Sequence, residues 1–192
     1  KNPISFVEGD IRDEALLLQS LKSSKAEVVL HCAGLKSISE SITKPDLYQS
    51  VNIGGLRSLT QAMRQSGVKK IIVRGSANVY GHPSTLPITE EARTDPQSPY
   101  GKTKLESEHI LKTLTEQDSQ WSAVVLRYFN PVGAHHSGFI GENPKGIPNN
   151  LMPILCQVAS GERSVLDIYG HDYATPDRTA IRDYVHIEDL AE

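Results

Sequence analysis

The sequence predicts an α/β fold with a doubly wound parallel sheet. Three continuous apolar runs, AEVVLHCAG, KKIIVRGS and WSAVVLRYFN, are typical of strands that are buried on both faces. Segments with helical spacing of apolar residues separate these runs. A strict alternation of strand and helix is typical of a parallel sheet with helices on both faces, whose ligands lie at the carboxyl ends of the strands.

The elements follow in order along the first half of the chain. NPISFVEGD predicts a short strand over Ile4–Val7 that ends in a turn. DEALLLQSLKSS predicts a helix with Asp13 as its cap, because its leucines recur at helical spacing. After the first buried strand, a long helical region spans roughly Pro45 to Gly67, where the glycine of QSGV is a stop signal.

The second half begins with a helix that has Ser98 as cap and Pro99 at its first position. Beyond the third buried strand come a Gly/Pro-rich loop from Pro131 to Pro148, a helix from about Asn149 to Ser160 and short strand-like pieces. We expect residues 1–130 to belong to a dinucleotide-binding domain. Residues 131–192 would start a smaller substrate domain and return to the first domain near 182–192.

The sequence lacks the Gly-rich turn that normally holds a dinucleotide pyrophosphate. Neither GxGxxG nor GxxGxxG occurs, and the first predicted strand begins within a few residues of the first residue. We therefore expect that turn to lie upstream, and the chain to be an internal fragment that is incomplete at its N-terminus and inactive by itself.

Composition excludes several classes of protein. Of the 192 residues, 38% are hydrophobic and 22% charged, the net charge is -3, and the basic residues are dispersed, which argues against nucleic-acid binding. The apolar runs are too short to span a bilayer. Cys32 and Cys156 lie far apart on predicted regular elements, so a reducing, cytoplasmic location is expected.

The stretch SPYGKTK places Tyr100 four residues before Lys104, on one face of a predicted helix. A phenol near a lysine ammonium and the positive end of a helix has a lowered pKa, which suits removal of a proton from a hydroxyl group. The alternative is a pair of ordinary surface residues. Ser76 ends a buried strand, where its hydroxyl could relay a proton to Tyr100 or simply belong to a turn.

Two further strand ends favour a cofactor. Ala33 and Gly34 are small enough for a flat molecule to approach the backbone, and Lys36 could reach a ribose or phosphate. In GDI, Asp10 could accept a hydrogen bond from adenine and Ile11 could cover the ring. Each of these positions has an alternative interpretation as turn chemistry.

The motifs taken together carry a resemblance. GDIRDEAL, HCAGLKSISES, SANVYG, PQSPYGKTK, LRYFNPVGAH, GIPNNLMP and AIRDYVHIEDLA occur in this order over essentially the whole chain. They closely resemble the UDP-glucose 4-epimerase (UDP-galactose 4-epimerase) family of the extended short-chain dehydrogenase/reductases. This resemblance implies a Rossmann-like, NAD-binding fold, a UDP-sugar substrate and a homodimer.

The resemblance also implies roles for individual residues. Tyr100 is the catalytic acid–base, Lys104 binds the nicotinamide ribose and lowers the tyrosine pKa, and Ser76 is their hydroxyl partner. The other positions implied to contact NAD are Asp10, Ile11, Cys32, Ala33, Gly34, Lys36, Asn52 and Phe129. The positions implied on the substrate side, besides Ser76 and Tyr100, are Tyr128, Asn130 (sugar), Asn150 and Arg182 (diphosphate), and Leu166, Ile168 and Tyr169 (uracil).

The implied reaction is C4 epimerisation of UDP-galactose and UDP-glucose. Tyr100 takes the proton of the 4-hydroxyl as hydride passes to NAD, and the resulting 4-keto sugar turns its other face before the hydride returns. UDP must be held tightly and the sugar loosely, and an arginine such as Arg182 suits a diphosphate.

The chain departs from the family pattern at four positions. Arg74 and Gly75 stand where serines are usual, Asn78 replaces a common threonine and Cys32 a common aromatic residue. A buried arginine needs an anionic partner or an exit to solvent. A non-catalytic nucleotide-sugar-binding remnant is therefore one alternative. A dehydratase is another, although Ala77 and Asn78 stand where dehydratases usually have Asp-Glu.

Histidines provide no predicted metal site. His135 and His136 form a pair in a Gly-rich loop, but no carboxylate or cysteine stands at ligand spacing, so a loop role is expected. His31, in a buried strand, is expected to be a hydrogen-bonded core histidine.

Overall fold

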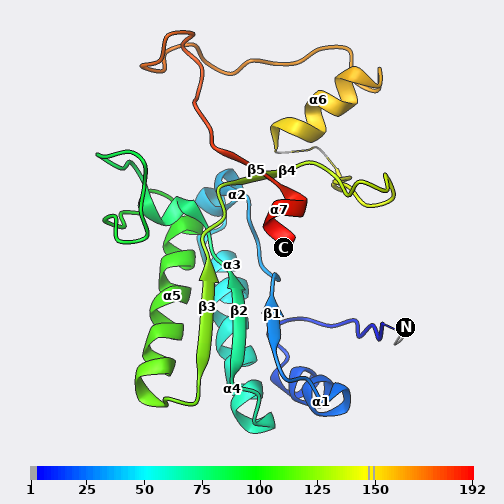
Figure 1. Ribbon diagram of the computed structural model, residues 1–192, viewed down its shortest axis with the longest axis vertical. Coiled ribbons are helices and arrows are strands. Elements are labelled where there is room, and N and C mark those ends of the chain that lie inside the picture. Colours follow the sequence, from blue (N-terminus) through cyan, green and yellow to red (C-terminus); the bar gives the residue numbers. More distant parts are fainter. Residues whose placement is uncertain (1–3, 147, 149) are drawn as a thin grey trace. The chain divides into compact units, whose positions relative to one another are not determined.

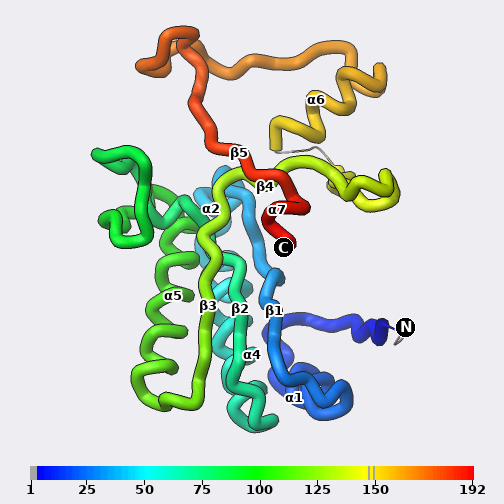
Figure 2. Tube along the Cα trace, viewed as in Figure 1, coloured from blue at the N-terminus to red at the C-terminus, as the bar shows by residue number. Residues whose placement is uncertain are grey.

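A computed structural model describes residues 4–146, 148 and 150–192 of the chain (Figures 1 and 2). The chain forms two units, unit 1 up to Tyr128 and unit 2 from Phe129 onward. The elements of unit 1 are α1 (Glu14–Ser24), β1 (Val29–His31), α2 (Ile38–Thr43), α3 (Pro45–Tyr48), a π-helical turn (Gln49–Gly54), α4 (Gly55–Ser66), β2 (Lys70–Arg74), a 3-10 turn (Ala77–Tyr80), α5 (Pro99–Gln117) and β3 (Ser122–Leu126).

Unit 1 contains a parallel sheet in the order β1-β2-β3 (Figure 1). The register places alternate residues of the three strands in rows on opposite faces. Two rows, Val29–Ile71–Ala123 and His31–Val73–Val125, lie on the face that packs against the helices. The row between them, Leu30–Ile72–Val124, points to the other face.

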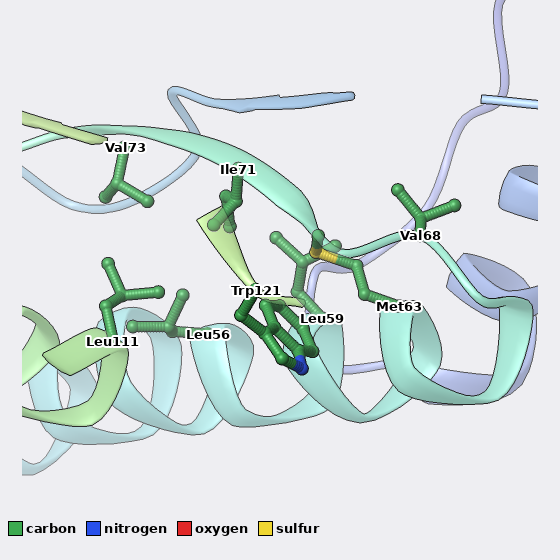
Figure 3. Close-up of a cluster of buried hydrophobic side chains, with 8 residues drawn as sticks. All are labelled: Leu56, Leu59, Met63, Val68, Ile71, Val73, Leu111 and Trp121. Atoms are coloured by element: carbon green, nitrogen blue, oxygen red, sulfur yellow. The ribbon is translucent and has the colours of Figure 1, made fainter. Parts of the chain in front are cut away.

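The core of unit 1 lies between this sheet and the helices. Figure 3 shows side chains of α4, α5 and β2 meeting there around Trp121. The fully buried members Leu56, Met63 and Leu111 come from facing sides of α4 and α5. Burial of each such side chain contributes roughly 1.5–3 kcal/mol of hydrophobic stabilisation.

The second face of the sheet differs from the prediction of helices on both faces. Leu30 is 64% and Val124 48% exposed, so no helix of the described residues covers their row. The reason is topological. Both connections, β1 to β2 and β2 to β3, step in the same direction along the sheet, and right-handed crossovers then put their helices on the same face. The parallel α/β fold itself is confirmed.

Local sequence explains where the helices begin and end. The Asp13 carboxylate accepts a hydrogen bond from the Leu16 amide, and the Ser98 hydroxyl accepts one from the Gly101 amide, as predicted for caps. Gly67 ends α4 in the left-handed region, at φ +80°, which a glycine adopts without strain. The predicted helical region from Pro45 to Gly67 is confirmed, with a π-helical turn inside it.

The strand predicted over Ile4–Val7 is not formed. Residues 4–10 have no regular structure, and Ile4 and Phe6 are 98% and 84% exposed. A strand needs a neighbour to accept and donate its backbone hydrogen bonds, and within the described chain no strand pairs with this segment. The segment therefore has the apolar pattern of a strand but lacks a neighbouring strand with which to form backbone hydrogen bonds.

Unit 2 is built on one pair of short parallel strands. β4 (Asn130–Val132) pairs with β5 (Tyr184–His186), and α6 (Leu151–Ala159) and α7 (Ile187–Ala191) are its helices. The helix predicted from about Asn149 thus begins at Leu151, while Ile147 and Asn149 of the GIPNNLMP motif lie outside the described residues. In the parts of both units that the structure describes, no helix combines the length and apolar character needed to cross a membrane.

Candidate functional site

The predicted catalytic residues lie where β2 ends and α5 begins. Ser76 follows β2 by two residues and caps the 3-10 turn, and Tyr100 and Lys104 occupy successive turns of α5. The start of α5 packs closely on the 3-10 turn, since a Cβ atom on Gly101 would lie 3.0 Å from the Asn78 carbonyl. Ser76 and Tyr100 are each only 5% exposed. The fold therefore places all three side chains at the carboxyl edge of one sheet.

A hydrogen bond to the backbone of β2 fixes Lys104 next to Tyr100. The Lys104 Nζ donates a hydrogen bond to the Arg74 carbonyl at 3.0 Å and lies 5.8 Å from the centroid of the Tyr100 ring. Burial, and after it the positive charge of Arg74, lower the pKa of Lys104 to about 8, with a smaller opposing effect of Cys32. Lys104 is thus a partly desolvated cation next to a phenol.

Arg74 itself lies against the last residue of unit 1. Its guanidinium carbon is 5.7 Å from the centroid of the Tyr128 ring, a cation–π distance. This contact gives the half-buried arginine a partner that the sequence did not reveal. Gly75 packs tightly on β3, because a Cβ atom there would lie 3.0 Å from the Leu126 carbonyl.

The Ser76 hydroxyl is oriented by Asn78. Its Oγ accepts hydrogen bonds from the Asn78 backbone amide at 3.2 Å and from the Asn78 side-chain amide at 3.0 Å. A hydroxyl can accept two hydrogen bonds and donate one. With both acceptor positions used, the proton of Ser76 is directed to a third group, which could be a substrate oxygen.

Asn52 fixes the loop that follows β1. Its Oδ1 accepts from the Leu35 amide at 2.8 Å, and its Nδ2 donates to the Leu35 carbonyl at 3.1 Å and to Thr103 Oγ1 at 3.1 Å. Gly34 lies against Asn52 at φ +146°, where a side chain would be strained. The side-chain oxygen and both N–H groups of Asn52 are therefore hydrogen-bonded within the protein. Through Thr103, these bonds connect the predicted cofactor loop to α5.

Sequence reasoning missed two residues of this arrangement. Thr103 is buried one turn after Tyr100 and receives the Asn52 hydrogen bond, and Tyr48 packs edge-on against the Tyr100 ring at 6.4 Å between centroids. Helical spacing from Tyr100 could have indicated Thr103. Nothing in the local pattern indicates Tyr48, which is 52 residues away in the sequence.

The other predicted cofactor residues of unit 1 lie near the ends of β1 and the first turn. Ile11, Cys32 and Ala33 line one pocket, and Lys36 is exposed. Asp10 accepts hydrogen bonds from Arg12 on both carboxylate oxygens, at 2.6–2.9 Å, and these contacts lower its pKa to about 2. Its expected role as an acceptor for adenine therefore competes with this ion pair.

His31 lies half-buried in β1. Burial, with a smaller effect of the Lys104 charge, lowers its pKa to about 4, so its imidazole is neutral near pH 7. This supports the expected structural role, although no hydrogen bond of its ring is observed within the described chain.

The predicted substrate-side residues other than Ser76, Tyr100 and Tyr128 belong to unit 2. Asn130 donates to the Asp183 carbonyl at 2.7 Å, and Asn150 donates to Glu142 at 3.0 Å just before α6. Arg182 is exposed and donates to the Ile181 carbonyl at 2.8 Å. The remaining substrate-side members, Leu166, Ile168 and Tyr169, are exposed to solvent, and so is Phe129, which is predicted to contact NAD.

Comparison with known proteins gives consistent matches. The model of the NAD dependent epimerase/dehydratase family matches residues 1–192. "UDP-glucose 4-epimerase 4" of Oryza sativa subsp. japonica is 50% identical over 189 residues, covering 98% of this chain and 51% of the relative. "UDP-glucose 4-epimerase" of Neisseria meningitidis serogroup C is 47% identical over 190 residues, covering 98% and 56%.

A solved structure agrees. UDP-glucose 4-epimerase from Bifidobacterium longum, crystallised in complex with NAD+ and UDP, has a TM-score of 0.95 and 48% identity. The match covers 99% of this chain and 57% of that one. The chain thus spans about half the length of the relatives it matches.

Proposed function

Because the chain belongs to the NAD-dependent epimerase/dehydratase family, we propose that it carries the catalytic residues of an enzyme that interconverts UDP-galactose and UDP-glucose. The observation that carries the proposal is the position of Lys104, hydrogen-bonded to the Arg74 carbonyl and 5.8 Å from the Tyr100 ring. This geometry supplies a positive charge next to a buried phenol, which is what proton removal from a sugar hydroxyl requires.

The donor set fits a nicotinamide cofactor. Among the described residues, Lys104 Nζ has one hydrogen-bond partner, so two of its three N–H groups can reach the hydroxyls of a ribose. The loop at Ala33 and Gly34, fixed by Asn52, offers backbone without bulky side chains. When bound, NAD would supply the acceptor and later the donor of the hydride at C4 of the sugar.

Tyr100 and Ser76 of unit 1 would have different roles in proton transfer. Tyr100, next to the Lys104 charge, takes the proton of the 4-hydroxyl and later returns it to the 4-oxygen, when hydride is delivered to the opposite face of the sugar. Ser76, oriented by Asn78, donates to the reacting oxygen and steadies the 4-keto sugar. Burial of Tyr100 and Ser76 excludes water, which strengthens both interactions.

Residues of unit 2 would hold the rest of the substrate. Arg182 and Asn150 suit the diphosphate, because a guanidinium pairs with phosphate oxygens and an amide donates to them. Asn130 would contact the sugar, and Leu166, Ile168 and Tyr169 would cover the uracil. All of these residues except the half-buried Asn130 are exposed and so accessible to a ligand.

Elimination chemistry of a dehydratase is less well supported. It needs an additional acid and base next to the catalytic hydroxyl, and Ala77 and Asn78 stand there. Asn78 has no proton to transfer at neutral pH, and its amide hydrogen-bonds Ser76. A non-catalytic remnant remains the alternative from another class, because of Arg74.

We also infer that the complete protein is a cytoplasmic homodimer. The free, exposed cysteines Cys32 and Cys156 suit a reducing compartment, and the resemblance to the epimerases favours the dimer. Sedimentation equilibrium of the complete protein would give its mass directly. A monomer at all concentrations would contradict the second part of the inference.

The decisive experiment measures conversion of UDP-galactose to UDP-glucose by the complete protein. The Tyr100→Phe variant should lose at least a hundredfold in turnover, since acid–base catalysis contributes roughly 10²–10⁴-fold. Tyr173→Phe, at an exposed tyrosine, is the matched control and should retain activity. A folded protein that binds UDP-sugar without turnover would favour the remnant.

A further inference from the structure

Three side chains of unit 2 meet outside the site described above. His135 and His136 follow β4, and Glu188 lies in the first turn of α7. One potential ligand atom from each residue lies within 4.8 Å of those of the other two. We propose that His135, His136 and Glu188 bind a divalent transition-metal cation, with Zn²⁺ the best match to the donors.

The fold of unit 2 explains how the three residues come together. β4 and β5 pair in parallel, with Val132 opposite His186, so both strands end at the same edge. His135 lies three residues beyond the first strand end and Glu188 two beyond the second. The Glu188 carboxylate is therefore close to the two histidines in space but far from them in the sequence. For this reason the spacing of ligands along the chain does not reveal it.

The distances are close to those of a metal site. Glu188 Oε1 lies 2.7 Å from His136 Nδ1 and 3.9 Å from His135 Nε2. Ligand atoms about 2.0–2.2 Å from a tetrahedral zinc ion are separated by roughly 3.3–3.6 Å from each other. The first distance must open by roughly 0.6–0.9 Å and the second must close by roughly 0.3–0.6 Å, which rotation of these partly exposed side chains allows.

The donor types select the metal. Two imidazoles and one carboxylate suit borderline cations such as Zn²⁺, whereas Mg²⁺ and Ca²⁺ prefer oxygen ligands throughout. Three protein ligands would leave a fourth position for water. The backbone amide and ring of His136 lower the pKa of Glu188 by hydrogen bonding, so its carboxylate is ionised and available near pH 7.

Neighbouring groups would orient the ligands. His135 Nδ1 lies 2.7 Å from Ser137 Oγ and also accepts from the Ser137 amide at 3.2 Å. Coordination through Nε2 requires the other tautomer, with the proton on Nδ1, which gives up the contact with the Ser137 amide and donates to Ser137 Oγ, the usual outer contact of a metal-binding histidine. His186 Nδ1, 4.0 Å from Glu188 Oε2, accepts from the Glu188 amide.

Metal binding would replace the contact between His136 and Glu188. Because a cation competes with protons for imidazole and carboxylate ligands, affinity should rise with pH. In physical terms, the cation would connect the loop after β4 to α7. The competing interpretation is that His136 and Glu188 form only a hydrogen-bonded pair. A pair of that kind would have no affinity for zinc.

Calorimetric titration of the complete, tag-free protein with ZnCl₂ after chelation tests the proposal. We expect saturable binding of one ion, with affinity reduced at least tenfold in His136→Gln and Glu188→Gln. The matched controls are His171→Gln and Glu162→Gln, exposed residues of the same unit, which should bind as the unsubstituted protein does. Circular dichroism verifies that each variant is folded.

Two further measurements sharpen the result. Co²⁺ should give visible absorption bands of a four- or five-coordinate site, which disappear in the same two variants, and millimolar Mg²⁺ should not displace Zn²⁺. Ser137→Ala should weaken binding about 10–100-fold. Absence of saturable zinc binding, or binding lost with Cys156→Ser but kept in His136→Gln, would overturn the assignment. None of these readouts involves UDP-sugar turnover, so the outcome is separate from the proposed function.

Discussion

Replacing Arg74 by methionine should raise the pKa of Lys104. Methionine keeps an apolar chain of similar length over Lys104 while it removes the guanidinium charge. Burial is the larger cause of the low pKa of Lys104, about 8, and the Arg74 charge is the second. The pKa in the Arg74→Met variant should therefore lie above 8 but remain below the ordinary lysine value of 10.5.

The magnitude follows from these two values. A pKa of 8 in place of 10.5 means that the surroundings disfavour the charged form by about 3 kcal/mol. At pH 9, about a tenth of the Lys104 side chains would be charged, against about 97% for a lysine at 10.5. Because the lowered pKa lets the unfolded chain bind more protons between pH 8 and 10.5, stability should rise with pH across that window.

Nuclear magnetic resonance of lysine labelled with ¹³C at Cε measures this titration without modifying the amine. The Lys104 signal is assigned by its absence in Lys104→Arg. Arg74→Lys, which keeps the charge, and Arg64→Met, at an exposed arginine of α4, are the controls and should leave the pKa near 8. A Lys104 pKa near 10.5 in the unsubstituted protein would refute the burial argument. An unchanged pKa in Arg74→Met would refute the role of the Arg74 charge.

Three further predictions concern stability, measured as the free energy of unfolding in urea. As pH falls from 6.5 to 4, the unsubstituted protein should lose stability because its partly buried His31 imidazole must take up a proton. The His31→Asn variant should lose less, by on the order of 3 kcal/mol at pH 4. Equal losses in the two proteins would contradict this. Glu108→Gln should cost about 2–3 kcal/mol, since the carboxylate binds Arg127 through two hydrogen bonds of 2.9 and 2.6 Å, whereas Glu116→Gln at an exposed pair should cost under about 0.5 kcal/mol. Leu111→Ala should cost about 2–5 kcal/mol by leaving a cavity in the core, and a neutral result would mean that the helix does not pack as described.

Contacts between neighbouring residues could be predicted from the sequence. The caps Asp13 and Ser98, the strand positions and the shared face of Tyr100 and Lys104 each depend on residues within one or two helical turns. For these, the local pattern contains the physical cause. The Asp10 ion pair with Arg12 is also local, and GDIRD could have indicated it.

Contacts between distant residues could not be predicted in this way. Asn52 binds Leu35 and Thr103, and Glu188 reaches His136, across separations of 17 to 52 residues. These pairings depend on strand register and on the packing of helices, which no local pattern determines. The missing strand at Ile4–Val7 has the same cause, because apolar alternation favours a strand only where a partner is available.

The uncovered row Leu30–Ile72–Val124 has a consequence for the behaviour of this chain in solution. An apolar strip on a parallel sheet is ordinarily shielded on both sides, and an open one is attractive to any other apolar surface. Preparations of these 192 residues alone should therefore become turbid with rising concentration, and sooner in sulfate, which strengthens apolar association. A charged residue in place of Leu30 would keep such preparations clear while leaving the helix-covered face intact.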